Sequence, residues 1–108
     1  MQLTIDEILE SLLRRGFYDP TEVDLWKEMA QTQVDAVIEE LAEVARELRR
    51  DRQDVVLAKK LDLAREAADV VVAAVCLLGA IVGPMSSSVI ASKMSDDEKR
   101  GYRHKGGL

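Results

Sequence analysis

Residues 21–50 contain no glycine and no proline, and this unbroken stretch restricts the fold more than any other feature of the chain. Its apolar residues recur every three or four positions, the spacing that places them on one face of an α-helix. They are Val34, Val37, Ile38, Leu41, Val44, Ala45 and Leu48. A second stretch, from about Asp54 to Val82, ends at Gly83-Pro84, a pair that stops helices. Two long helices are therefore predicted, joined by a charged turn after Arg50.

Shorter helices are predicted on both sides of this pair. Thr4 and Glu7 have the spacing of a capping box in front of apolar residues at helical spacing, and Gly16 ends this first helix. Three serines at residues 86–88 can cap a fourth helix that reaches about Lys99. The whole chain is therefore predicted to be all-α.

The 108 residues fit a single domain, with residues 1–20 as an N-terminal helix and link and residues 100–108 as a flexible basic tail. The predicted architecture is a helical bundle of two long antiparallel helices and shorter ones, completed by dimerisation. Residues 70–82 favour dimerisation because they are apolar throughout, and a small chain cannot easily cover such a helix alone. At 13 residues this run is shorter than a bilayer span, which needs roughly 20, so no membrane contact is expected.

Net charge and cysteine content narrow the function classes. The net charge of −5 argues against nucleic-acid binding, which depends on basic residues that neutralise phosphates. An acidic chain can still bind a polyphosphate when a divalent cation bridges the two. The single cysteine, Cys76, lies among apolar residues and is expected to be a buried free thiol. A cytoplasmic location is therefore expected.

Acidic residues gather on one face of each long helix. On the first helix they fall within an arc of about 100° on a helical wheel; they are Glu39, Glu40, Glu43 and Glu47. On the second helix they form a stripe that turns from acidic to apolar along the chain: Asp62, Glu66, Asp69, Ala73, Cys76 and Ala80. Asp69 is thus expected to enter a dry region, where a carboxylate must be paired or bound to a metal.

Two simpler interpretations stay open at this point. The acidic faces can be ordinary solvated surfaces, above all on the first helix, where the acids lie roughly opposite the apolar stripe. Asp69 can also form a structural ion pair with Arg65, four residues earlier. Against both, carboxylates that face each other across two helices repel, and a hard cation such as Mg²⁺ is the usual solution. Zinc and di-iron sites are disfavoured because the single histidine, His104, lies in the tail.

The acids also match a known pattern. Residues 39–43, EELAE, are followed after 22 residues by residues 66–69, EAAD. This pairing of ExxE with ExxD resembles the signature of the MazG-like nucleotide pyrophosphohydrolases, over about residues 26–107. That family is all-α and hydrolyses nucleoside triphosphates to the monophosphate and pyrophosphate. The resemblance implies a house-cleaning enzyme of the nucleotide pool that uses Mg²⁺, or Mn²⁺ in its place, and works as a homodimer or a tetramer (a dimer of dimers).

The resemblance also implies roles for individual residues. The implied metal ligands are Glu40, Glu43, Glu66 and Asp69. Glu39 would orient the attacking water or a ligand. The family register K-x₃-N-x₂-R falls on Lys93, Asp97 and Arg100, so that Lys93 and Arg100 would bind phosphate while an aspartate replaces the asparagine. Weaker contacts to the base are expected from Trp26, Gln31, Gln33 and Asp97.

Two other functions compete with this one. Phosphoribosyl-ATP pyrophosphohydrolases are relatives of similar size and motif. A non-catalytic helical dimerisation module would need the same apolar surfaces without the metal. The base and sugar preference does not follow from the sequence.

Overall fold

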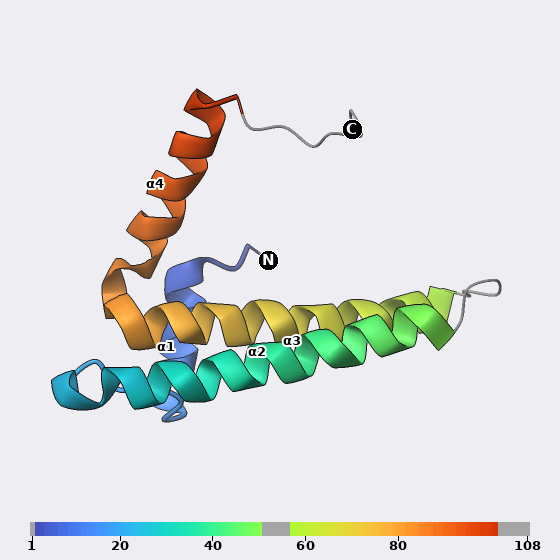
Figure 1. Cartoon of the computed structure of the whole chain (residues 1–108), viewed down its shortest axis with the longest axis horizontal. Helices are drawn as coiled ribbons and strands as arrows, with labels where there is room; N and C mark the ends of the chain where they lie inside the picture. Colours follow the sequence, from blue (N-terminus) through green and yellow to red (C-terminus); the bar gives the residue numbers. More distant parts are fainter. Residues whose placement is uncertain (1, 51–56, 102–108) are drawn as a thin grey trace.

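The computed structural model describes residues 2–50 and 57–101, which contain helices and turns but no strand. Two long helices, α2 (Trp26–Arg50) and α3 (Leu57–Val82), pack side by side and form an antiparallel hairpin (Figure 1). The all-α fold class and the pair of long antiparallel helices are therefore confirmed. The predicted turn after Arg50 and the predicted start of a helix at Asp54 lie outside the described residues.

The start of α2 differs from the prediction by one short element. A 3₁₀ turn, η1 (Val23–Leu25), comes before the helix, which begins at Trp26 instead of Thr21. Asp19 fixes the approach, because its Oδ1 accepts hydrogen bonds from the backbone N of Thr21 at 2.9 Å and from its Oγ1 at 2.6 Å. A carboxylate bonded to the backbone two residues on forms a turn, so Thr21 belongs to that turn and not to the helix.

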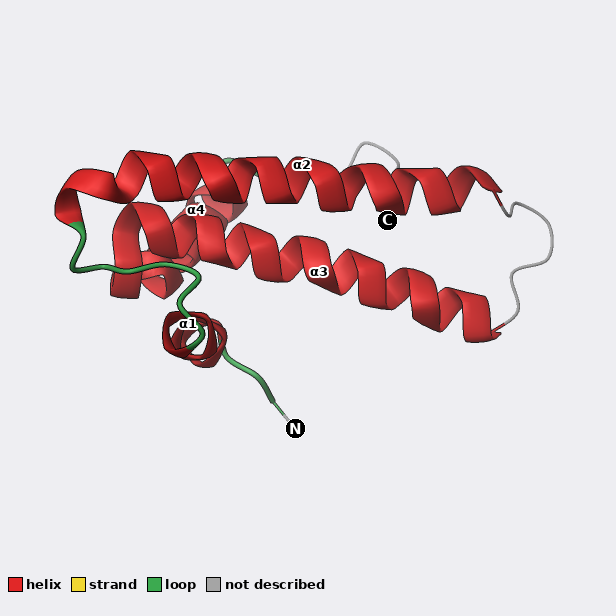
Figure 2. Ribbon diagram, turned by 90° about the horizontal axis from the view of Figure 1, so that it is seen from below, coloured by secondary structure: helices red, strands yellow, loops and turns green. Residues whose placement is uncertain are grey.

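Helix α1 (Ile5–Arg14) crosses α3 on one side of the hairpin (Figure 2). The predicted capping box is confirmed: Thr4 Oγ1 accepts from the backbone N of Glu7 at 3.1 Å, and the Glu7 carboxylate accepts from the backbone N of Thr4 at 3.4 Å. Gly16 ends this helix as predicted, with a φ of +78° that side-chain-bearing residues rarely adopt.

The buried core lies where α1 meets the end of α3. It contains Leu9, Leu12, Tyr18, Ala30, Val75, Cys76 and Ala80. Gly79 permits the close approach, because a Cβ at this position would lie 2.9 Å from Leu9 Cδ2. The hydroxyl of Tyr18 donates to the Leu9 carbonyl at 3.3 Å, which joins the link after α1 back to that helix. Cys76 is a buried free thiol, as predicted, and burial raises its pKa.

Gly83 stops α3 as predicted and turns the chain into a fourth helix. Its φ of +58° starts a 3₁₀ turn, η2 (Gly83–Met85), and α4 (Ser86–Lys99) then leads away from the hairpin (Figure 1). The prediction that serines cap α4 is wrong. Met85 occupies the cap position without a side-chain hydrogen bond, and the buried Ser86 Oγ instead donates to the Gly83 carbonyl at 2.7 Å. The serine thus stabilises the corner between the two helices.

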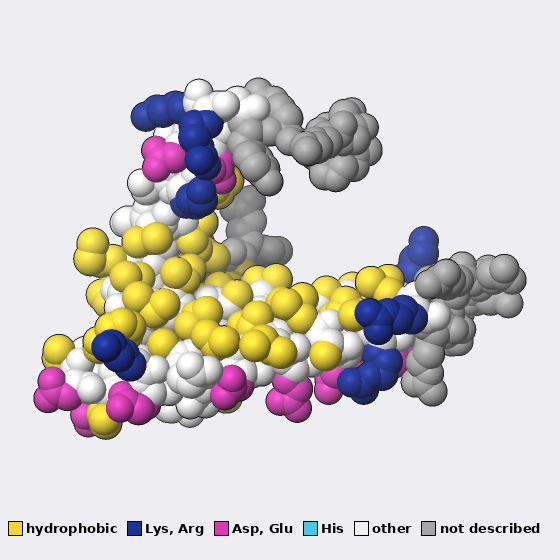
Figure 3. All heavy atoms as spheres, viewed as in Figure 1, with side chains coloured by type: hydrophobic (Ala, Val, Ile, Leu, Met, Phe, Trp, Pro, Cys, Tyr) yellow, Lys and Arg dark blue, Asp and Glu magenta, His cyan; other side chains and the backbone are white. Residues whose placement is uncertain are grey.

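The apolar run at residues 70–82 is only partly covered within this chain. Val75, Cys76 and Ala80 are buried, but Val71 and Ile81 are about half exposed, because α1 and α2 cover only two sides of α3. Figure 3 shows a broad apolar surface over the hairpin and the base of α4. The stretch Lys60–Lys99 is long and apolar enough to cross a membrane, a criterion that core helices of soluble proteins also meet.

Candidate functional site

The hairpin brings the two acidic motifs together. Burial and the neighbouring carboxylates raise the pKa of Glu40. In order of their effect on this pKa, those neighbours are Glu43, Asp69, Glu39 and Glu66. Two of them come from the ExxE segment of α2 and two from the ExxD segment of α3. All five predicted acids therefore lie close enough together to influence one another. We call them the acidic cluster: Glu39, Glu40, Glu43, Glu66 and Asp69.

The burial of the acidic cluster differs from the prediction in one respect. Glu40, Glu43 and Glu66 are partly buried along the contact between α2 and α3, whereas Glu39 and Asp69 are exposed. The expectation that Asp69 enters a dry region is wrong, because α1 covers the stripe on α3 only at Cys76 and Ala80. The alternative ion pair between Arg65 and Asp69 is not formed either; both residues belong to the described part of the chain, and no ion pair joins them.

Glu66 is the most unusual member of the acidic cluster. Its Oε2 atom is buried and has no hydrogen-bond partner. A buried oxygen that has lost its water without gaining a donor costs free energy, and the cost is larger when the group is charged. A cation or a hydrogen-bond donor beside this oxygen would reduce that cost.

The acidic cluster is not a finished metal cage. Among residues 2–50 and 57–101, no three His, Cys, Asp or Glu side chains lie close enough together to hold a metal ion as they stand. Glutamate side chains have three rotatable bonds, so a change of rotamer would be needed to bring the carboxylates of Glu40, Glu43 and Glu66 around one ion. The hairpin thus brings carboxylate oxygens into one region, but they do not surround a single metal position.

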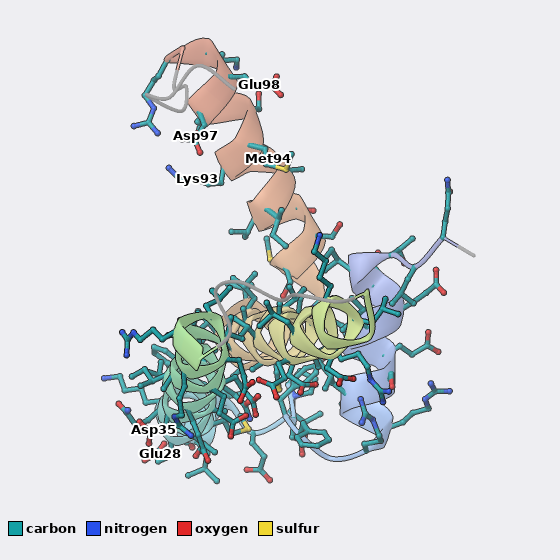
Figure 4. The ribbon with its side chains drawn as sticks, turned by 90° about the vertical axis from the view of Figure 1, so that its right-hand side faces the viewer. Glu28, Asp35, Lys93, Met94, Asp97 and Glu98 are labelled. Atoms are coloured by element: carbon teal, nitrogen blue, oxygen red, sulfur yellow. The ribbon has the colours of Figure 1, made fainter. Side chains whose placement is uncertain are left out.

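The predicted phosphate-binding residues lie elsewhere. Lys93 and Arg100 both bind the carboxylate of Asp97 along α4, with Lys93 Nζ at 3.0 Å from Oδ1, and these contacts lower the pKa of Asp97. Lys93 and Arg100 also line a cavity of about 360 Å³. The base of α4 at Gly83 is about 21 Å along α3 from Asp69, at 1.5 Å per residue. Figure 4 shows Lys93 and Asp97 on α4, well away from the hairpin.

The predicted base-binding residues also do not meet the acidic cluster. Trp26 is partly exposed and lines a cavity of about 410 Å³, but it lies about 21 Å along α2 from Glu40. Gln31 donates to Asp35 Oδ1 at 3.1 Å and is exposed.

Gln33 has a structural position that sequence reasoning missed. It is buried, and its Nε2 donates to the Phe17 carbonyl at 3.4 Å, which fastens the link after α1 to the hairpin. The signal was present in the sequence: Gln33 lies one helical turn before Val37, and both residues are covered to some degree in the hairpin.

Comparison with known proteins finds no family model, no curated protein and no solved structure that matches the chain. The resemblance to MazG-like enzymes therefore rests on the two acidic motifs and their spacing, and it stays a prediction.

Proposed function

We propose that this protein is a Mg²⁺-dependent nucleoside triphosphate pyrophosphohydrolase that releases pyrophosphate and a nucleoside monophosphate. The observation that supports this most is the acidic cluster itself. Two motifs separated by 22 residues meet across an antiparallel hairpin, and one of their oxygens, Glu66 Oε2, is buried without a partner. On an ordinary solvated surface this oxygen would bind water, so its burial without a partner favours a functional site.

The donor set fits a hard cation. Glu40, Glu43, Glu66 and Asp69 offer only carboxylate oxygens, the ligands that Mg²⁺ prefers, and their side chains would turn inward to hold it. When bound, Mg²⁺ would neutralise the polyphosphate and make an attacking water more acidic. Glu39, exposed at the edge of the acidic cluster, would accept a hydrogen bond from that water and orient it. The resemblance would add Lys93 and Arg100 to stabilise the negative charge that develops on the phosphates, although α4 leads away from the acidic cluster within one chain.

Pyrophosphate release over a panel of nucleoside triphosphates, with phosphoribosyl-ATP included, tests this proposal. We expect Mg²⁺-dependent release from at least one substrate and its loss in Glu66→Gln. Glu28→Gln is the matched control, because it makes the same change on α2 about 18 Å from Glu40 along the axis. Figure 4 shows Glu28 on the outer side of α2. No release from any substrate, or equal activity of both variants, would contradict the proposal.

One observation favours a second function, the non-catalytic dimerisation module. The hairpin exposes many large apolar side chains, and no ready metal cage is present in the described residues. Added Mg²⁺ separates the two functions, since a cation that binds only the folded state raises the melting temperature. A module without a metal site would melt at the same temperature with and without Mg²⁺.

A further inference from the structure

A cavity of about 410 Å³ lies at the end of the hairpin from which α4 departs. Residues of the link after α1, the start of α2 and the corner at Gly83 line it, and Figure 2 shows the link and the start of α2 beside the end of α3. A cavity of this size can hold a small organic molecule. It is separate from the acidic cluster, because Trp26 in its lining lies about 21 Å along α2 from Glu40.

Most of the cavity lining is apolar, and part of it is exposed to solvent. Four large apolar side chains line the cavity and are also 40–73% exposed: Val23, Trp26, Ile81 and Met85. Exposed apolar residues that gather around a cavity are typical of a ligand-binding site, whereas residues scattered singly over a surface need no such explanation. The body of a ligand for this cavity is therefore expected to be apolar.

The ionisable groups of the cavity lining are all acidic. They are Asp19 and Glu22, and no lysine, arginine or histidine of the described chain lines the cavity. Hydrogen bonds from Thr21 hold the pKa of Asp19 below its ordinary value, so this carboxylate is ionised at neutral pH. Two carboxylates beside an apolar wall attract a positively charged ligand and repel an anionic one such as a nucleotide.

Trp26 adds a second attraction for a cation. The face of an indole ring attracts positive charge, and the attraction is stronger where water is excluded. The ring already has one cationic neighbour, because Nζ of Lys27 lies 5.8 Å from its centre. Lys27 is exposed and does not line the cavity, whereas the ring does. A cation inside the cavity would therefore have both the ring and the carboxylates beside it.

We propose that this cavity binds an organic cation, an ammonium group carried by an aromatic or alkyl body. The body fills the apolar part of the cavity, and the ammonium group binds the Trp26 ring and the carboxylates of Asp19 and Glu22. Charge decides against the other occupants, since a polyphosphate is repelled and a neutral apolar molecule gains nothing from the carboxylates. The inference does not depend on the proposed function, because the cavity is remote from the acidic cluster.

The first test uses the fluorescence of Trp26, which is the only tryptophan and therefore reports on the cavity alone. The whole protein is titrated with phenethylamine, which is protonated at neutral pH, and with 2-phenylethanol, a neutral molecule of the same shape. We expect the amine to change the emission and to bind about 10-fold more tightly than the alcohol. Equal affinities, or no binding of either compound, would overturn the inference. An emission that changes on concentrating the protein without amine would show that a second copy fills the cavity, and would also overturn it.

The second test removes the negative charge while keeping the local fold. In the double variant Asp19→Asn with Glu22→Gln, the asparagine oxygen can still accept the two hydrogen bonds from Thr21, so the turn is kept. We expect this variant to bind the amine and the alcohol equally well. Asp24→Asn is the matched control, because Asp24 is an exposed acid on η1 outside the cavity lining, and it should keep the preference for the amine. A double variant that keeps the full preference would overturn the inference.

Melting temperatures give a measurement that does not need fluorescence. Phenethylamine should raise the melting temperature of the wild type, because it binds the folded state, and should leave that of Trp26→Ala unchanged. An equal rise in both proteins would mean that the amine binds outside the cavity, which would contradict the proposal.

Discussion

One stripe along α3 has two halves with opposite properties. In the first half, Asp62 and Asp69 are exposed and Glu66 is partly buried, whereas in the second half Cys76 and Ala80 are buried. The helix is continuous and the stripe is straight, so the backbone does not cause the difference. The difference comes from α1, which crosses the second half and stops short of the first (Figure 2). An element from the other end of the chain thus decides which part of one helix is core and which part is available for chemistry.

The largest effect is expected from moving an acid across this boundary. Cys76→Asp places a carboxylate under α1 at a position that is 1% exposed, where the charge of Arg15 compensates it only in part, and should destabilise the fold by about 3 kcal/mol or more. Denaturant unfolding measures the change, with Cys76→Ala as the control for lost volume. A Cys76→Asp protein with wild-type stability would show that the second half is not sealed.

The converse change removes an acid from the open half. Asp69→Asn should lower Mg²⁺-dependent hydrolysis by about 100-fold or more, because it removes an implied metal ligand. The melting temperature of the metal-free protein should change little, since Asp69 is exposed and has no ion-pair partner in the described chain. Steady-state kinetics and thermal melts of the same preparation check both expectations. Near-normal turnover would remove Asp69 from the site.

Gly79→Ala tests how closely α1 must approach to seal the second half. The added Cβ would lie 2.9 Å from Leu9 Cδ2 and 3.2 Å from the ring of Tyr18, so side chains must shift. We expect a net loss of about 1–2 kcal/mol, because the usual cost of overpacking a core is partly offset by the higher helix propensity of alanine. The rise in melting temperature on addition of Mg²⁺ should stay the same, because the acidic cluster is not changed. A melting temperature equal to that of the wild type would mean that α1 is held less tightly than the geometry indicates.

The acidic half should also have a characteristic pH dependence. Burial and the surrounding carboxylates raise the pKa of Glu40 above the ordinary value of 4.5. A raised pKa means that the folded state holds the proton more tightly, so this contribution to stability is complete below about pH 4.5 and is lost as the pH rises through the folded-state pKa. Melting temperatures between pH 4 and 8 should therefore fall less in Glu40→Gln than in the wild type, both without metal. Identical pH profiles would place Glu40 outside the acidic cluster.

The smallest effect is expected on α4, far from both halves. Asp97→Asn removes a partly exposed carboxylate that binds the exposed Lys93 and Arg100, and surface ion pairs contribute less than about 1 kcal/mol. Stability should therefore change little. The two cations lose their intrachain partner, so the Michaelis constant for the nucleotide should fall by a few-fold at low salt and by less at high salt. An unchanged constant at low salt would argue that these cations do not contact substrate.

Much of the fold follows from local sequence signals. The capping box at Thr4, the glycines that end α1 and α3, and the unbroken apolar stripe of α2 each depend on residues within a few positions of one another. The predicted capping by the serines at residues 86–88 was wrong, because Ser86 is used by the tight turn before it. The start of α2 was misplaced for the same reason, since the Asp19 turn competes with the helix for Thr21.

The sequence allowed us to predict only those features of the site that depend on the α2–α3 hairpin alone. The meeting of Glu40 and Glu43 with Glu66 and Asp69 follows from two antiparallel helices with a short connection. The exposure of Asp69 did not follow, because it depends on where α1 crosses, a contact between residues more than 60 positions apart. Motif spacing also could not predict the distances from Trp26 and Lys93 to the acidic cluster. These distances depend on the straightness of α2 and on the corner at Gly83.

That corner also sets the phase of α4. Each residue of an α-helix advances the chain by 1.5 Å and rotates it by 100°, so a single insertion between Gly83 and Lys93 would turn both cations about a quarter of a revolution or more away from their present direction. A seven-residue insertion would nearly restore the direction and move the cations about 10 Å outward. The number of residues between Gly83 and Lys93 is therefore as important for the position of the two cations as the cations themselves. Related chains that keep both cations should have insertions and deletions outside this segment.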